Sequence, residues 1–290
     1  MKKVLLATTA LVLSAGVASA EVALSGSARM GLTYDSDSGD TVLNNRATVN
    51  IDASTETTSG LTFGARLRIR SSNGEVATVN GARVYLKSGA VEVAVGNIYG
   101  ALDSMPGMYN SEVGLTALSD AGVVAAPLVN GWGFDGYSST GEQMGVEAIY
   151  SAGAFTGHLS VTDTDLGSAT DRTAAYGAYT MNDWTVALGV QDSDLNTEDK
   201  TVLTVGGKIG DYGVGFAAAD NDGEQKIALN GSATFGATTV NGFVADEESG
   251  AETPMGLGVS YDLGGAALVG GVERDADGVK RADMGVSFSF

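Results

Sequence analysis

The sequence predicts an all-β fold: a transmembrane antiparallel β-barrel of sixteen strands, with one long loop folded into the lumen. Hydrophobic and polar residues alternate with period two in nearly every segment, and no long segment has the 3.6-residue period of a helix. Many alternating segments are about ten residues long, which suits a tilted membrane-crossing strand, whereas strands of a soluble sandwich are mostly nearer five or six. The sequence also ends inside a strand, at Phe290, as closure of the last strand on the first requires.

Residues 1–20 have the features of a cleaved signal peptide. Lys2 and Lys3 form a basic start, an apolar stretch follows, and Ala18-Ser19-Ala20 is a small-x-small cleavage site. A retained membrane anchor is the alternative, but the apolar stretch is shorter than the ~20 residues that a spanning helix needs. We therefore expect an exported chain that begins at Glu21 and forms a single barrel domain over residues 21–290.

The composition of the mature chain excludes several classes of protein. Its fourteen basic and thirty-five acidic residues give a net charge of −21, which repels nucleic acid. There is no cysteine, so disulfides and thiolate metal sites are excluded. Forty-two glycines with only three prolines suit many tight turns between strands that keep their hydrogen-bond donors.

The strands follow one another along the chain with tight turns and polar loops between them. In the first, Val22, Leu24 and Leu32 lie on one face and Ser25 and Arg29 on the other. Gly210-Asp211, Gly236 and Gly264-Gly265 suit hairpin turns. Merging or splitting of weak strands would change the count to fourteen or eighteen. The sixteen candidates cover residues 22–34, 44–55, 60–71, 80–88, 90–97, 142–151, 154–163, 172–181, 183–192, 200–209, 212–220, 224–235, 237–246, 254–262, 266–274 and 281–290.

One segment, residues 97–141, breaks this pattern. It alternates poorly and contains Pro106 and Pro127, two of the three prolines. A strand-free stretch of this length is uncommon unless it is functional or disordered. Its aromatic and aliphatic residues, such as Trp132 and Phe134, argue against disorder and require a cover. We expect this long loop to enter the barrel, where the interior of a sixteen-stranded barrel leaves room for a water-filled channel.

Several stretches, in the same order along the chain, resemble the alphaproteobacterial general porins of the Rhodobacter type. They are EVALSGSARMGLTY from Glu21, SGLTFGA from Ser59, YSAGAF from Tyr150, FGATTVNGFV from Phe235 and GLGVSYDLGGAALVGGV from Gly256. The resemblance implies a passive diffusion channel in the outer membrane of a Gram-negative bacterium, in contact with lipid and lipopolysaccharide. It also implies a homotrimer, and a loop after the fifth strand that narrows the barrel.

The charged residues suggest where the channel is constricted. Half of the basic residues of the mature chain fall in the first four strands, each on the face opposite an apolar stripe; they are Arg29, Arg46, Arg66, Arg68, Arg70, Arg83 and Lys87. An arginine facing lipid at mid-depth costs ~2–4 kcal/mol, so we expect these side chains to face the lumen. The long loop carries acidic residues, Asp103, Glu112, Asp120 and Asp135. We predict that the two groups oppose each other across the channel; the alternative is a set of solvated lumen arginines without special grouping.

Signals for catalysis or for cofactors are weak. His158 is the one histidine, and alternation places it on the lumen side as a solvated residue without a catalytic partner near it in sequence. Acidic stretches such as 35–40, 220–224 and 246–248 contain enough oxygen atoms to suggest calcium, but none has the spacing of a dedicated calcium loop. We therefore expect no enzyme activity, no cofactor and solvated acidic loops; calcium binding in those loops is the alternative.

The sequence predicts an outer-membrane channel for passive diffusion of small hydrophilic solutes and ions. Two alternatives remain open: a structural or adhesive barrel with a plugged lumen and partner-binding outer loops, and a soluble exported sandwich that binds a ligand.

Overall fold

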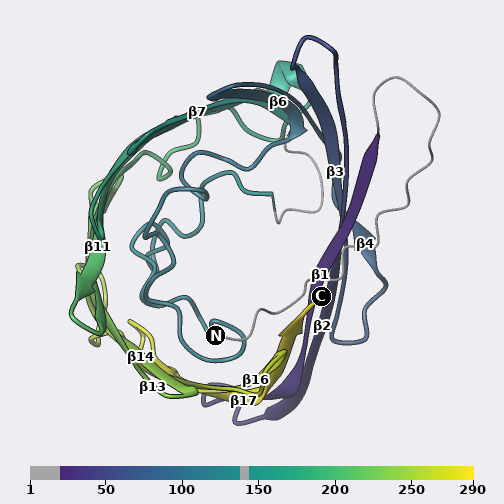
Figure 1. The fold of residues 1–290 in the computed structure, drawn as a ribbon. Helices are drawn as coiled ribbons and strands as arrows, with labels where there is room; N and C mark the ends of the chain where they lie inside the picture. Colours follow the sequence, from purple (N-terminus) through teal and green to yellow (C-terminus); the bar gives the residue numbers. More distant parts are fainter. Residues whose placement is uncertain (1–19, 138–143) are drawn as a thin grey trace.

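The computed structural model describes residues 20–137 and 144–290, which form a closed antiparallel barrel (Figure 1). Sixteen strands build the wall, and β4 is an additional two-residue strand paired with β3. The strands are β1 (Glu21–Asp35), β2 (Thr41–Glu56), β3 (Thr62–Ser72), β4 (Thr78–Val79), β5 (Arg83–Ser88), β6 (Val91–Asn97), β7 (Met144–Ala152), β8 (Phe155–Thr162), β9 (Arg172–Met181), β10 (Trp184–Ser193), β11 (Lys200–Ile209), β12 (Tyr212–Asn221), β13 (Glu224–Phe235), β14 (Thr238–Glu247), β15 (Met255–Asp262), β16 (Ala266–Arg274) and β17 (Lys280–Ser289). A short 3-10 helix, η1 (Thr164–Leu166), lies between β8 and β9.

The last strand closes the barrel on the first, as predicted. Strand β1 pairs with β2 on one side and with β17 on the other. Beyond the last paired residues, Gly26 and Phe290 exchange two backbone hydrogen bonds of 2.8 and 3.0 Å. Closure matters because an open sheet would expose unpaired backbone groups to lipid, where no water satisfies them.

The predicted strands agree with the observed ones to within three residues at each described end. The predicted strand 80–88 begins only at Arg83, because residues 80–82 lie between the segments that pair with β3; the backbone N–H of Asn80 still donates to the carbonyl of Arg68 at 2.9 Å. There Asn80 turns inward and donates a hydrogen bond to the carbonyl of Tyr137 in the long loop. The predicted leader and the end of the predicted long loop, residues 138–141, lie outside the described residues.

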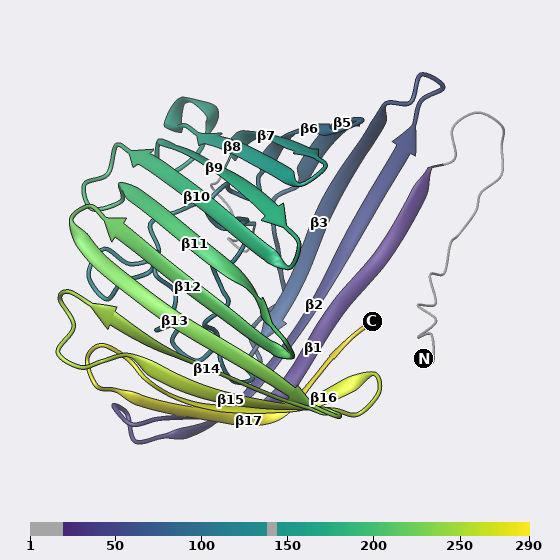
Figure 2. The same ribbon diagram turned by 60° about the vertical axis from the view of Figure 1, so that its left-hand side comes forward.

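Most tight turns lie at one end of the barrel and the longer loops at the other (Figure 2), although the two-residue turn 222–223 between β12 and β13 lies at the end with the longer loops. Residues 182–183, 210–211 and 236–237 each connect two strands directly. Asn182 and Gly210 have φ of +53° and +61°, the left-handed conformation that two-residue hairpin turns require. The predicted turn positions are therefore confirmed.

The burial pattern is the reverse of that of a water-soluble protein. On β10, outward-facing Leu188 is 54% exposed while inward-facing Ala187 is 1% exposed. The interior instead buries charged side chains, including Arg83, Lys200 and Lys226. A soluble sandwich would bury the apolar face of each strand, so this pattern identifies an outer surface that faces lipid. In the described part of the chain, no helix is both long and apolar enough to cross a membrane.

A belt of outward-facing aromatic side chains surrounds the barrel at the end with the tight turns. Its members are exposed and lie close to those turns: Phe63, Tyr150, Phe155, Tyr179, Trp184, Tyr212, Phe235, Tyr261 and Phe288. Toward the opposite end, the outward faces of β10, β12 and β14 reach the exposed residues Asp192, Asp220 and Asp246. Aromatic side chains favour the membrane–water interface and carboxylates favour water, so these two features mark the limits of the apolar band.

Candidate functional site

The long loop between β6 and β7 lies inside the barrel, as predicted (Figure 1). Its described part, residues 98–137, consists of turns and irregular backbone. The apolar side chains of the loop are buried against a barrel wall whose inward-facing residues are small; these wall residues include Ala174, Ala178, Ala187, Ala217, Ala219, Ala228 and Ala245. On the loop the buried residues include Leu102, Met105, Met108, Val123 and Val124. Small wall residues leave space for the loop to approach this side of the barrel.

Polar side chains of the wall satisfy the backbone of the loop. Asp283 on β17 accepts hydrogen bonds from the backbone N–H groups of Leu115 and Thr116 at 2.9 and 2.7 Å. Asn221 on β12 donates to the carbonyl of Val124 at 3.0 Å. A buried loop without secondary structure needs such partners, because each unpaired backbone group would be costly. The loop is thus held against the wall from β7 to β17.

An ion-pair cluster fixes the start of the loop. The guanidinium of Arg83 contacts the carboxylates of Glu147 and Glu92, each at 2.6 Å. Glu147 also bonds His158 Nε2 and accepts the backbone N–H of Tyr99, both at 2.9 Å. The ring of Tyr99 lies under the guanidinium of Arg83, 3.9 Å from its ring centre. His158 therefore faces inward, as predicted, but it is buried in this cluster and is not solvated.

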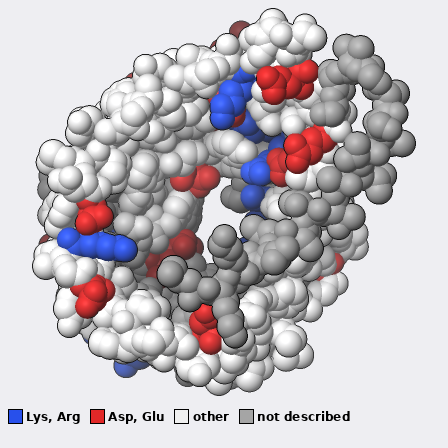
Figure 3. Space-filling view, viewed as in Figure 1, with Lys and Arg blue, Asp and Glu red and all other residues white. Residues whose placement is uncertain are grey.

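A cavity of about 600 Å³ lies between the loop and the wall formed by β2 and β3. Arg46 and Arg70 line it from the wall, and Asp103, Glu112 and Asp120 line it from the loop. In the view along the barrel, basic side chains gather at the right and upper right of a central hollow, with some acidic side chains beside them, and further acidic side chains lie to the left of the hollow (Figure 3). The wall and the loop thus present opposite charges to one cavity. Its lining is completed by Tyr109, Thr116, Ala117, Trp132, Phe134 and Gly136.

Strand register brings the wall arginines together. Arg29 on β1 lies directly opposite Arg46 on β2, and on β3 Arg70 lies opposite Thr48. Among the described residues, no carboxylate forms an ion pair with Arg29, Arg46, Arg68 or Arg70. Like charges that face each other across a ladder destabilise a sheet, so this wall retains positive charge at a cost in stability.

The acidic side of the cavity includes a pair of carboxyl groups. Glu112 and Asp120 share a side-chain hydrogen bond. Burial, together with the charge of Asp120, raises the pKa of Glu112 to about 8. Burial also raises the pKa of Asp120, against the attraction of Arg46. Near neutral pH the pair therefore holds a proton, because two adjacent buried carboxylates repel each other.

Not all predicted members of the site lie at the cavity. Arg83 is buried in the ion-pair cluster, and Lys87 is exposed at the end of β5, close to a tight turn. Arg66 is paired with Asp52 at 2.6 Å. Asp135 faces the opposite wall, where Arg172 contacts it at 2.9 Å. Alternation identifies only the face of a strand, so it could not distinguish these positions from those at the cavity.

The prediction also missed residues that line the cavity. Tyr109, Trp132 and Phe134 form an aromatic group on the loop side. The sequence predicts that Trp132 and Phe134 need cover, but the spacing of these two residues and Tyr109 contains no period that would place the three rings beside one another. Only the folded path of the loop does so.

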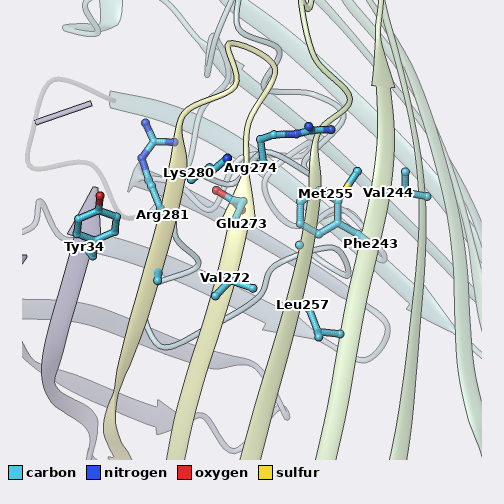
Figure 4. A pocket seen from close by; sticks show the side chains of 12 residues that line it. Tyr34, Phe243, Val244, Met255, Leu257, Val272, Glu273, Arg274, Lys280 and Arg281 are labelled. Atoms are coloured by element: carbon cyan, nitrogen blue, oxygen red, sulfur yellow. The ribbon is translucent and has the colours of Figure 1, made fainter. Parts of the chain in front are cut away.

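A second hollow, of about 650 Å³, lies outside the lumen on β14–β17 and β1 (Figure 4). It is lined by outward-facing apolar side chains such as Val244, Leu257 and Val272, and Arg274 and Lys280 lie at its loop end. Its apolar floor faces the lipid side of the wall, so it is separate from the charged lumen cavity. Among the described residues, no group of three or more acidic or histidine side chains is placed to hold a metal ion.

Comparison with known proteins agrees with this architecture. A family model described as Gram-negative porin matches residues 7–280. Porin of Fuscovulum blasticum is 31% identical and porin of Rhodobacter capsulatus 32% identical; each alignment covers 93% of this chain and all of the relative. Two solved variants of Rh. blastica porin match with TM-scores of 0.84 and 0.83 at 28% identity, again over 93% of this chain and all of theirs. Among other changes, the first replaces an aspartate and a glutamate by alanine, and the second a lysine and an arginine.

Proposed function

Because this chain belongs to the Gram-negative porin family and forms a multi-pass β-barrel of the outer membrane, we propose that it passes small hydrophilic solutes and ions by passive diffusion through a charged constriction. The constriction is the cavity between Arg46 and Arg70 on the wall and Asp103, Glu112 and Asp120 on the loop. The observation that carries this proposal is that one cavity is lined by carboxyl groups from the loop and by guanidinium groups from the wall, which form no ion pair with any carboxylate in the described part of the chain.

Opposed charges create a transverse field in the constriction. A polar solute aligns its dipole with such a field, whereas an apolar solute must displace oriented water without compensation. The wall attracts anions locally, although the net charge of the mature chain is negative. The field therefore selects for polarity and tunes the preference for ions, without any covalent step.

Transport without catalysis is part of the same proposal. Among the residues that the structure describes, the cavity is lined by arginines, carboxyl groups, aromatic rings and the hydroxyl group of Thr116, but by no histidine, cysteine or serine. His158, the remaining candidate base, is buried in the cluster with Glu147 and Arg83. The family membership supports the same conclusion, because its members that match this chain are named porins.

The decisive experiment is conductance in a planar lipid bilayer. Purified protein is expected to produce stepwise channels in KCl, whereas a plugged, adhesive barrel would leave the bilayer silent. We also propose a homotrimer, on the basis of the sequence resemblance; closure in three equal steps would support it, and single-step closure would contradict it.

The charged constriction is tested by reversal potentials under a salt gradient. A double Arg46→Gln, Arg70→Gln variant is expected to shift selectivity toward cations, because it removes two positive charges from the cavity. Arg274→Gln is the matched control, since Arg274 lies on the outer wall. An unchanged reversal potential in the double variant, or an equal shift in the control, would overturn the charged constriction but not the channel.

A further inference from the structure

The lumen cavity contains an aromatic surface as well as charges. Tyr109 and Trp132 are stacked, with ring centres 6.1 Å apart and planes 16° from parallel. The ring of Phe134 is tilted by 47° against that of Trp132, with ring centres 5.3 Å apart. Trp132 is 46% exposed, whereas Phe134 is 8% exposed. An indole supported from behind and open to the cavity is a ready surface for a planar ring.

This surface is held in place before any solute arrives. The hydroxyl of Tyr109 donates a hydrogen bond to Asp103. On the far side of the aromatic group, Gln191 donates to the carbonyl of Gly133 at 2.6 Å, and this bond fixes the backbone between Trp132 and Phe134. A surface that is already ordered loses little conformational entropy when it binds.

The opposite side of the cavity supplies unpaired positive charge. Arg46 and Arg70 both line the cavity, and no carboxylate of the described residues forms an ion pair with either. By contrast, the acidic groups already have partners: Asp103 is bonded to Tyr109, and Glu112 to Asp120. The groups of the cavity that are free to bind a charged solute are therefore the two guanidinium groups, and their ligand would be an anion. A guanidinium presents a planar fork of donors that matches a carboxylate.

We infer that this cavity is a weak binding subsite for small aromatic carboxylates, with the ring against Trp132 and Tyr109 and the carboxylate toward Arg46 and Arg70. The inference rests on the proposed channel function and adds a preferred class of solute to it. A volume of about 600 Å³ lies in the range of small-molecule sites, about 300–1,000 Å³, and accepts one such solute together with water. Binding must be weak, because a solute that passes has to leave again.

The first test measures binding without requiring conduction. Trp132 and Trp184 are the two tryptophans, and Trp184 lies on the outer wall. In a Trp184→Phe variant, Trp132 is the sole tryptophan and its fluorescence reports on the cavity. Titration with benzoate is expected to give a saturable change. Cyclohexanecarboxylate, which has the same charge without the aromatic ring, and benzylammonium, which has the opposite charge, are expected to bind several-fold more weakly.

Variants of the wall identify the carboxylate site. Addition of Arg46→Gln and Arg70→Gln to the Trp184→Phe protein is expected to weaken benzoate binding at least about tenfold, since a charge-assisted hydrogen bond is lost at each position. Arg274→Gln again serves as the control. Equal binding of benzoate and cyclohexanecarboxylate, or unchanged benzoate binding in the double variant, would overturn the subsite.

The second test measures ion current. Benzoate is expected to reduce the KCl current of the wild-type channel, and Trp132→Leu to relieve that reduction while Trp132→Phe retains most of it. Heat-modifiable migration in detergent checks that each barrel is folded. If KCl current is normal but benzoate has no effect, the subsite is wrong and the channel stands. If KCl current is absent, the proposed channel fails, and the fluorescence titration still decides the subsite.

Discussion

The pairing of Arg29 with Arg46 across β1 and β2 places two like charges side by side, which lowers stability and adds positive charge to the wall. Two guanidinium groups that face each other in register repel, and no carboxylate of the described residues forms an ion pair with either of them. Further along β3, away from the cavity, the charge of Arg66 is balanced by an ion pair with Asp52. The positive charge that has no ion-pair partner among the described residues therefore lies at the cavity that we propose as the constriction.

We expect Arg46→Gln to stabilise the barrel while it weakens the positive wall. Removal of a like-charge pair directly opposite in a sheet contributes roughly 0.2–1 kcal/mol to the free energy of unfolding. The change is measured from samples heated to increasing temperatures before electrophoresis, as the temperature at which half of the folded band is lost. Arg66→Gln is the comparison, because it breaks the ion pair with Asp52 and is expected to lower the midpoint. A lower midpoint for Arg46→Gln would contradict the repulsion.

The raised pKa of Glu112, about 8, predicts that selectivity depends on pH. Below this pH the glutamate is protonated and neutral, and above it the glutamate adds a negative charge to the cavity. The pair faces Arg46 and Arg29 on the wall, Lys226 on β13, and Asp103 on the loop. Reversal potentials are therefore expected to shift toward cation preference between pH 6 and pH 9.5. Glu112→Gln should abolish most of this shift, and an equal shift in that variant would exclude Glu112 as its cause.

At the scale of elements, the long loop is stable because the wall against which it packs offers both space and hydrogen-bond partners. Inward-facing alanines provide the space, and Asp283, Glu273 and Asn221 provide hydrogen bonds to the loop backbone. The aspartate joins residues 168 positions apart in the chain. The loop therefore links strands that are far apart in the chain, and it also forms one side of the cavity.

Asp283→Ala is expected to loosen the loop. The substitution leaves the backbone N–H groups of Leu115 and Thr116 without their acceptor, at a cost of about 1–3 kcal/mol for each group that stays buried. Increased current noise and faster cleavage of the loop by protease would report this change. The exposed turn residue Asp211 supplies a control, Asp211→Ala, which should leave both readouts unchanged. Identical noise and cleavage in the two variants would show that Asp283 does not hold the loop.

At the scale of the whole molecule, the outer surface records the position of the membrane. On β10 the outward-facing residues run from Trp184 in the aromatic belt through Leu188 to Asp192 near the outer loops. The same order of aromatic, aliphatic and acidic residues recurs on β12, from Tyr212 to Asp220. One apolar band therefore passes around the barrel between an interface and water.

Leu188→Arg tests the depth of this band. A charge in the middle of the lipid-facing surface is expected to lower the free energy of unfolding by about 2–4 kcal/mol. Denaturant titration in lipid vesicles measures this quantity. Asp192→Arg exchanges one charge for another at the edge of the band and should cost at most ~1 kcal/mol. Equal costs at the two positions would mean that the band does not end where the aspartate lies.

The strands, their number and their lipid-facing sides follow from the sequence alone. A membrane-spanning wall requires a strict two-residue alternation, which can be recognised within a short segment of the sequence. Alternation also indicated correctly that the arginines of β1–β3 face inward, and the lack of alternation in residues 97–141 marked the loop. Alternation could not show that Arg83 is buried behind the loop, that Lys87 lies near a turn, or that Asp135 pairs with Arg172.

Those outcomes depend on contacts between residues far apart in the chain. The path of the loop is set by partners on β7 to β17, such as Asp283 and Glu147, and no local pattern encodes which partner meets which loop residue. The tertiary structure therefore decided which charges meet at the cavity and brought Trp132, Arg46 and Arg70 to the same cavity. Local periodicity determined the barrel, and long-range packing of one irregular segment determined what its lumen presents to a solute.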